Sequence, residues 1–413
     1  MVCLSLSPKT GNLPEEEALG KIAVEDGREE EKTVFYTALY HTMIDPRVFS
    51  DVDGRYPGAN GRILQSSTYT RRTIFSGWDV FRSQFPLQTL INPRVVRDML
   101  ADAYAKGIRD FDVAKGYLYA QHSVDLFGNG AQGYTGGENS ISKTLEYAYS
   151  DWCFARLAGL LGKKDDSAVY GKKAFNYRNV FDTSKHWFRP RKEDGSWEPW
   201  PAAGRLQQDY GTVESNPYQQ GWFIPQDVPG MVRLMGGSEK VRDDLDSIFA
   251  NTPENMMWND YYNQANEPVH HIPFLFNRIG YPWLTQKWTR AICARVYHKG
   301  VEGLVGNEDV GQMSAWYVLA ASGLHPVCPG DARYEITSPV FSRVVIRLDP
   351  AYSKGKSFTI LARGNSPQNV YIQSAMLNGK PYPHCWLDYK DISAGGILEL
   401  WMGPAPATGW GIL

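Results

Sequence analysis

Three acidic residues share one arrangement in the sequence, because each stands just ahead of a predicted helix. Glu214 lies in YGTVESNPYQQGW, Glu267 in NEPVHH and Asp309 in NED. A single acid at a helix start is more often an N-cap or half of a surface salt bridge, since a carboxylate accepts the free backbone N–H groups there. Three such acids, 53 and 42 residues apart, favour a site, because helix starts on one rim of a helical ring converge on its central cavity.

The surroundings of two of these acids predict opposite ionisation. Tyr210, Tyr218 and Trp222 flank Glu214, and an aromatic, partly apolar setting disfavours a charged carboxylate. Asp309 precedes a helix whose N–H groups would favour the charged form. Two carboxyl groups with separated pKa values are typical of an acid–base pair. We therefore expect Glu214 to be a general acid and Asp309 a general base.

The strongest helical pattern follows Asp309 directly. In the stretch 306–317, GNEDVGQMSAWY, and just beyond it, apolar residues recur at the i, i+3, i+4 and i+7 spacing of a helical face: Met313, Trp316, Tyr317 and Ala320. Asp309 and Gln312 are spaced as a capping box. The pattern predicts a buried helix with an acid at its start.

Trp78, Asp79 and Arg82 form another polar group, at the front of an apolar helical stretch. They could form a platform and clamp for a sugar, or a buried ion pair, and the sequence favours neither.

Two other signals point only weakly to metals. His270 and His271 are adjacent, so on a helix they face different sides and cannot form a two-ligand metal face. A packed or substrate-contacting histidine is the better interpretation. Asp51 and Asp53, which precede Gly54, have part of the spacing of a calcium loop, but Arg55 breaks the EF-hand pattern.

Composition excludes several classes of protein. The net charge of −2 gives no basic field for nucleic acid, and no apolar stretch is long enough to span a membrane. Thirteen Trp and 24 Tyr suit carbohydrate binding or a dense aromatic core. The five cysteines are odd in number, widely spaced and without a CxxC pair, which indicates neither a disulfide framework nor a zinc site. The N-terminus lacks the features of a secretory signal, so the expectation is a soluble, intracellular chain.

The sequence pattern changes from helical to strand-like near residue 325. Up to that point helical patterns alternate with long loops, which suggests an α/α toroid. Beyond it, turn signals separate short alternating runs typical of antiparallel strands: Val344–Leu348, Ser357–Ala362, Asn369–Leu377 and Gly396–Met402. We expect a helical catalytic domain over 1–325, with an irregular lead-in over 1–20, and a small β-rich domain over 326–413.

Several blocks together resemble glycoside hydrolase family 92, and they occur in that family's order: FYTALYHT, DVDGRYPG, GWDVFRSQFPL, ESNPYQQGWFIPQDVPGMVRLMGG, NEPVHHIPFLFNRIG and GNEDVGQMSAWYVLAASGLHPVCPG. The resemblance implies a calcium-dependent, inverting exo-α-mannosidase that acts on mannose-rich N-glycans of glycoproteins, with a preference for α-1,2 linkages. It also implies a mainly α fold, an (α/α)6 barrel with a small antiparallel β unit at the C-terminus.

The resemblance assigns roles by motif. Glu214 matches the catalytic acid and Asp309 the base, while Glu267, with Asp309, matches the calcium centre. The substrate-binding positions that it implies are Asp53, Trp78, Asp79, Arg82, Asn216, Gln219, His270 and Asn307. Asn307 stands where many members of the family have a second Asp.

Two departures from the family pattern bear on the pocket. Relatives carry an N-terminal β-sandwich domain that completes the pocket, and this chain has no counterpart of it. The family also has a Trp-x-Pro-x-Trp and Met-x-Gly loop, whereas here the chain runs from Pro93 through Met99 straight to Asp102. About one hairpin of the barrel is therefore expected to be missing.

Three other functions compete with an active mannosidase. The chain could be a non-catalytic relic that still binds mannosides, or a helical scaffold without a pocket. It could also be an amidase that cleaves the bond between glycan and asparagine, although no recognisable Cys-His-Asp arrangement supports that reaction.

Overall fold

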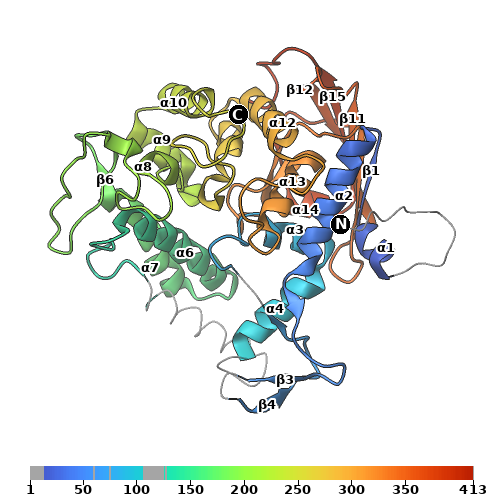
Figure 1. Cartoon of the computed structure of the whole chain (residues 1–413), viewed down its shortest axis with the longest axis horizontal. Helices are drawn as coiled ribbons and strands as arrows, with labels where there is room; N and C mark the ends of the chain where they lie inside the picture. The colour runs from blue at the N-terminus through green and yellow to red at the C-terminus, as the bar shows by residue number, and fades with distance from the viewer. Residues whose placement is uncertain (1–13, 59–60, 74–75, 106–124, 126–127, 413) are drawn as a thin grey trace.

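The structure is a computed structural model that describes residues 14–58, 61–73, 76–105, 125 and 128–412 (Figure 1). A body of helices makes up most of the molecule, and a β-sheet packs beside α2 and α12 at the upper right of the view. The fold is mainly α, with an incomplete (α/α)6 barrel and a small sheet in the C-terminal region, as predicted.

The helices of the described residues follow one another with long loops between them. They are α1 (Pro14–Leu19), α2 (Glu29–Ile44), α3 (Gln84–Ile91), α4 (Pro93–Ala105), α6 (Ser140–Leu160), α7 (Lys164–Lys173), α8 (Pro217–Gln220), α9 (Val228–Met235), α10 (Ser238–Ala250), α11 (Leu275–Arg278), α12 (Pro282–Val296), α13 (Gln312–Ser322) and α14 (Tyr389–Ser393). Short 3-10 turns complete the helical segments: Asn176–Val180, Gly204–Leu206, Pro225–Asp227, Glu267–Val269 and Ile272–Phe274.

The strands form one main sheet and several small ones. They are β1 (Ile22–Glu25), β2 (Arg47–Val48), β3 (Arg55–Pro57), β4 (Ile63–Gln65), β5 (Arg72–Thr73), β6 (Phe181–Asp182), β7 (Trp187–Phe188), β8 (Leu324–His325), β9 (Arg333–Ile336), β10 (Arg343–Arg347), β11 (Ser357–Arg363), β12 (Tyr371–Leu377), β13 (Lys380–Pro381), β14 (Trp386–Asp388) and β15 (Gly396–Gly403).

The main sheet has the order β1-β10-β11-β15-β12-β13. Its pairs are antiparallel except that β11 and β15 run parallel, which the strand pattern did not predict. β12 and β13 are joined by Asn378-Gly379, both with positive φ, the signature of a tight hairpin turn. Along β11 the side chains of Phe358, Ile360 and Ala362 alternate into the core.

The N-terminal strand β1 pairs with β10, with Ile22 opposite Ile346. A segment from the start of the chain thus forms one edge of the sheet whose other strands follow residue 340. The domain boundary at residue 325 stays a prediction.

The centre of the helical body is α13, whose eleven residues are all buried. Trp316 packs on Tyr297 with stacked rings 5.9 Å apart, and its indole N–H donates to the His270 carbonyl oxygen at 2.9 Å. A helix that is enclosed on every side holds its N-terminus in a fixed place. The loop with Asp309 is attached to that terminus.

Candidate active site

Three carboxylates from distant parts of the chain meet at one point. Oxygen atoms of Asp79, Glu267 and Asp309 all lie within 4.8 Å of one another. Asp79 comes from the turn before α3, Glu267 from the 3-10 turn that it begins, and Asp309 from the loop before α13. Asp79 and Glu267 are buried, and Asp309 is half-buried. The structure therefore brings together two of the three predicted helix-start acids and adds Asp79 to them.

Crowding and burial disfavour the charged forms of two of these acids. Burial, followed by the negative charges of Asp79 and Asp309, raises the pKa of Glu267 to about 9. Burial raises the pKa of Asp79 to about 6, although a hydrogen bond from the Ser76 hydroxyl opposes the rise. Three carboxylates in mutual contact are unfavourable without a compensating positive charge.

The cluster fits a divalent cation of the hard, oxygen-binding kind. Asp79 Oδ1 and Glu267 Oε1 are buried and accept no hydrogen bond. Such orphaned acceptors are costly unless another group satisfies them. An all-oxygen set of carboxylates is what hard cations prefer. We conclude that Asp79, Glu267 and Asp309 form a candidate metal-binding triad.

The loop with Asp309 has a strained backbone. Asp309 and Val310 both take positive φ, 42° and 53°, which is uncommon for any residue with a side chain and most unusual for a β-branched one. Gly306 has φ 74°, and a Cβ there would lie 2.5 Å from the Ala265 carbonyl oxygen. This loop and the loop that leads to Glu267 therefore touch backbone to backbone.

The predicted capping box between Asp309 and Gln312 is wrong. The N-cap of α13 is Gly311, with φ 92° and no side-chain cap. The Asp309 side chain makes no cap hydrogen bond to this helix and lies beside Asp79 and Glu267 instead. Gln312 instead accepts hydrogen bonds at its Oε1 from the backbone N–H groups of Ser83 and Gln84, at 2.9 and 3.0 Å.

The neighbouring acid, Glu308, takes the capping role. Its Oε1 accepts the Ser314 backbone N–H at 3.0 Å, and its Oε2 accepts the Ser314 hydroxyl at 2.8 Å. Oε2 also lies 3.1 Å from His41 Nδ1 on α2, and the hydrogen bond with Glu308 raises the pKa of His41. Glu308 thus ties the Asp309 loop to two helices. The sequence correctly predicted an acidic cap at the start of this helix, but the cap was assigned to Asp309 instead of Glu308.

Glu214 lies at the edge of the same site. Its charge contributes, after that of Asp309, to the raised pKa of Asp79. Its backbone, at φ 53°, accepts a hydrogen bond from Asn266 Nδ2 at 2.9 Å, so the loops of Glu214 and Glu267 are joined. The side chain is exposed, and the expected aromatic enclosure is absent, because Trp222 is fully buried and the Tyr218 hydroxyl bonds to Asp244.

Three of the predicted substrate-binding residues make hydrogen bonds within the protein. Asn216 caps α8 by accepting the Gln219 N–H at 3.0 Å, as predicted for an N-cap before proline. Gln219 Nε2 donates to the carbonyl oxygens of residues 259 and 261, at 2.7 Å each. His270 is fully buried, with Nδ1 3.2 Å from Gln312 Nε2. Their direct contact with a sugar stays an untested prediction.

Arg82 belongs to a buried ion pair, although not with Asp79. Its Nη2 donates to Glu146 Oε1 at 2.7 Å, and its Nε donates to the Trp78 carbonyl oxygen at 2.9 Å. The guanidinium lies 4.7 Å from the ring centroid of Phe223. Trp78 itself is half-buried. Glu146, in the middle of α6, was missed, because nothing in its local sequence distinguishes it from other helical acids.

The remaining two predicted residues are exposed. Asp53 is in the β3–β4 region that projects from the body (Figure 1), and its Oδ2 accepts from Arg55 Nε at 2.6 Å. Asn307 is exposed in the Asp309 loop. Neither position tests the predicted contact with substrate.

A helical barrel whose loops bring three carboxylates together is compatible with a helical glycoside hydrolase. The profile described as "Glycosyl hydrolase family 92 catalytic domain" matches residues 15–101 and 97–404. The chain therefore belongs to glycosyl hydrolase family 92.

Known relatives agree with this assignment. An "Uncharacterized secreted glycosidase" of Arthroderma benhamiae is 27% identical over 461 residues, covering 96% of this chain and 56% of the relative. The family GH92 α-mannosidase BT3965 from Bacteroides thetaiotaomicron has a TM-score of 0.87 and 30% identity over 97% of this chain and 59% of its own. The inverting mannosidase BT2199 from the same organism has a TM-score of 0.85 and 29% identity, covering 97% and 63%. The chain spans about three fifths of these relatives.

Among the residues that the structure describes, no helix is both long and apolar enough to cross a membrane.

Proposed function

We propose that the chain is the catalytic part of an inverting α-mannosidase, with Glu214 as general acid and Asp309 as general base. The observation that carries this proposal is the contact between Asp79, Glu267 and Asp309, with Glu214 close enough to influence Asp79, in a chain of family 92. BT3965 has also been solved with mannoimidazole, which supports a mannoside as the ligand.

The proposed reaction needs one proton donor and one acceptor on opposite faces of the sugar. Glu214 would give its proton to the glycosidic oxygen as the bond from that oxygen to C1 breaks. A water would form the new bond to C1 from the other face and give its proton to Asp309. Inversion of this kind requires the two carboxyl groups to stand roughly 6.5–9.5 Å apart, with room for the water.

Calcium is the cation that we propose for the triad of Asp79, Glu267 and Asp309. When bound, a hard cation with open positions can hold adjacent sugar hydroxyls and favour a distorted ring. The side chains themselves would orient that cation and would give up the proton that the raised pKa of Glu267 retains. A carboxylate has two oxygens, so Asp309 could hold the cation with one of them and accept a proton at the other.

We further propose mannose-rich N-glycans of glycoproteins, with α-1,2 linkages, as the substrate. This proposal is supported by the resemblance of the motif blocks. It is not based on any residue assigned to contact a second sugar. The N-terminal β-sandwich domain expected in relatives would add to their pocket, so linkage preference is the part of the proposal that depends most on residues outside this sequence.

The test is hydrolysis of α-1,2-mannobiose by the purified chain with calcium, followed by NMR. Inversion predicts that β-mannose appears first. We expect Glu214→Gln to lower kcat by roughly 10²–10⁴-fold, the usual contribution of general acid catalysis, and Glu302→Gln, at an exposed position, to leave it unchanged. Release of a whole glycan from a glycoprotein would indicate an amidase. Binding of mannoside without turnover would indicate a relic, and binding of neither mannose nor calcium would leave only a scaffold.

A further inference from the structure

The side chain of Gln312, at the start of α13, is fully buried and uses every hydrogen-bonding position of its amide. Its Oε1 accepts the backbone N–H groups of Ser83 and Gln84, at 2.9 and 3.0 Å. Its Nε2 lies 3.0 Å from Ser83 Oγ and 3.2 Å from His270 Nδ1. Two backbone N–H donors converge only on an acceptor, so the oxygen of the amide must face them. The NH₂ group therefore donates to Ser83 and to His270.

Two of the elements that this amide joins each carry a triad acid one turn away. The backbone N–H of Gln312 donates to the Asp309 carbonyl oxygen at 3.2 Å. In the same way, the backbone N–H of His270 donates to the Glu267 carbonyl oxygen at 3.0 Å. Because each bond closes a tight turn of four residues, the position of the acid follows the position of the residue that closes its turn.

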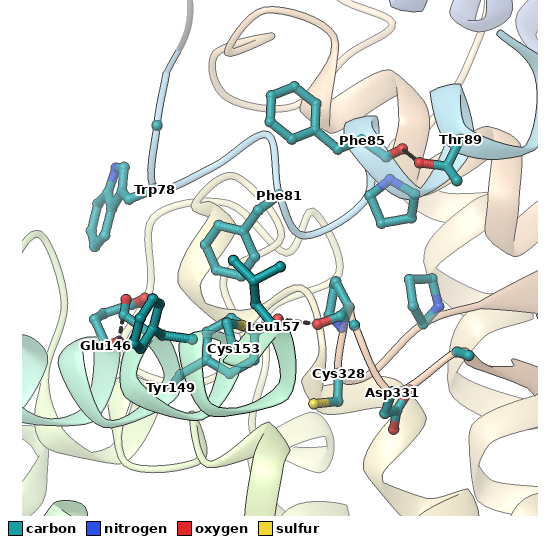
Figure 2. Close-up of a pocket in the computed structure, with 18 of the residues that line it drawn as sticks. Trp78, Phe81, Phe85, Thr89, Glu146, Tyr149, Cys153, Leu157, Cys328 and Asp331 are labelled. Atoms are coloured by element: carbon teal, nitrogen blue, oxygen red, sulfur yellow. Dashed lines mark hydrogen bonds between the residues drawn. The ribbon is translucent and has the colours of Figure 1, made fainter. Parts of the chain in front are cut away.

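The third acid, Asp79, lies on the segment that leads into α3. The backbone N–H of Arg82 donates to the Asp79 carbonyl oxygen at 3.0 Å, and Ser83 follows as the N-cap of α3. Figure 2 shows this segment along the wall of a cavity of about 1100 Å³, with Phe81 and Phe85 among the lining residues. The aromatic side chains of the segment thus line the cavity, while its backbone at the start of α3 is bound by the amide on α13.

The same bonds determine which ring nitrogen carries the proton in two buried histidines. Burial lowers the pKa of His270 to about 3 and that of His325 well below its usual value, so both rings are neutral. His270 Nε2 lies 3.1 Å from a backbone carbonyl oxygen, which only accepts, so the proton is on Nε2 and Nδ1 is free to accept from Gln312. His325 Nδ1 likewise faces a carbonyl oxygen at 2.8 Å, and its Nε2 accepts the Ser83 hydroxyl at 2.9 Å. Every donor in this chain of bonds meets an acceptor.

We propose that Gln312 is a positioning residue for the triad, whose amide fixes the separation of Asp79, Glu267 and Asp309 and thereby the affinity of the site for its cation. The three acids lie on separate elements, and like charges in contact push those elements apart. A buried amide that binds all three elements keeps the acids together before the ion arrives, which is the preorganisation that a tight site requires. The inference rests on the cation site proposed above, but its first test needs no cation.

The first test is hydrogen–deuterium exchange, followed by mass spectrometry, on the whole chain in EGTA. Gln312→Met keeps an unbranched side chain of similar length and removes its four hydrogen bonds. We expect exchange at least tenfold faster in both segments 76–85 and 264–271. The matched control is Gln286→Met on α12, at a glutamine that is 1% exposed and whose Oε1 accepts the Ile372 N–H at 2.9 Å. It should change exchange in these two segments less than twofold.

The second test is calcium binding, measured by calorimetry on the same two variants. We expect Gln312→Met to weaken binding at least tenfold and Gln286→Met less than twofold, although both changes lower the Tm. Equal weakening in the two variants overturns the proposal. A natural chain that binds no calcium would overturn the cation site and with it the effect on affinity, and the exchange test would then decide whether Gln312 joins the segments. Faster exchange in 76–85 alone also overturns the proposal, because the amide would then only cap α3.

A third measurement uses the natural chain, so it decides the matter even if Gln312→Met does not fold. Nitrogen-15 NMR of the chain labelled at histidine reports which ring nitrogen is protonated. We expect the proton on Nε2 of His270, whose ring lies 6.2 Å from that of Trp316, and on Nδ1 of His325, whose ring stacks on Phe274 at 3.9 Å. These ring contacts identify the two signals. A proton on Nδ1 of His270 would leave Gln312 without a bond to the turn of the second acid and would overturn the proposal.

Discussion

Replacing Glu267 by glutamine should make the protein more stable without calcium and less responsive to it. In the folded chain, burial and two neighbouring carboxylates raise the pKa of Glu267 from 4.5 to about 9. Between these two values the folded state holds a proton that the unfolded state releases. Stability therefore falls as pH rises through this window, since the folded state binds more protons. Glutamine has the same shape and no proton to lose, so it removes this slope.

The size of the effect follows from the pKa shift. At pH 7.5, three pH units above the unfolded value, the cost is about 4 kcal/mol at 1.36 kcal/mol per unit, and at pH 5 it is under about 1 kcal/mol. This cost of about 4 kcal/mol is an upper limit, because the electrostatic repulsion is distributed over Asp79, Glu267 and Asp309. Calcium at 100 times its Kd should stabilise the natural chain by about 2.7 kcal/mol. It should stabilise Glu267→Gln much less, because a neutral amide is a weaker ligand than a carboxylate.

The assay is urea unfolding in EGTA at pH 5 and 7.5, and again with calcium. Glu302→Gln, an exposed change of the same kind, is the control and should track the natural chain. The reasoning is refuted if Glu267→Gln is no more stable than the natural chain at pH 7.5 in EGTA. It is refuted equally if calcium stabilises both proteins by the same amount.

Other substitutions test the contacts that hold the site. Arg82→Met should lower the free energy of unfolding by about 3–5 kcal/mol, measured in urea, because it leaves Glu146 buried without its cation. The double change Arg82→Met with Glu146→Leu should lower it by less. An equal loss in the two variants would contradict this account. Glu308→Gln should lower stability by about 1 kcal/mol. The two oxygens of Glu308 accept the Ser314 N–H and hydroxyl, and in glutamine one of these oxygens is replaced by an NH₂ donor. An unchanged Tm would argue against the cap. Asn216→Ala should also cost about 1 kcal/mol through loss of the α8 cap, measured by the same unfolding, and no loss would show that the cap is dispensable.

Local sequence patterns predicted the elements better than the contacts at their ends. The helix after Asp309 was predicted from its apolar spacing and is present, although it is buried on every face rather than one. The capping box failed because tertiary contacts set the N-terminus of this helix. Gly311 packs against Gln84 and Thr42, where a Cβ would lie 2.9 Å from Gln84 Nε2. A short-range signature has no information about such a contact.

The composition of the site shows the same limit. Asp79 and Glu267 are 188 residues apart, and no spacing rule could place their oxygens in one cluster. Asp79 was therefore assigned to sugar contact or to a buried ion pair, and not to a metal site. In contrast, the helix-start argument for Glu267 and Asp309 needed only that neighbouring loops converge. This expectation holds because the loops touch at Gly306 and Ala265.

The loops of the triad are tied to several parts of the helical body. The triad loops are held by the hydrogen bonds of Gln312 to the start of α3, of Glu308 to Ser314 and of Asn266 to the Glu214 backbone. A chain that binds calcium without hydrolysing mannosides would locate the defect outside the triad, whereas a chain that fails to bind calcium would locate it in the triad.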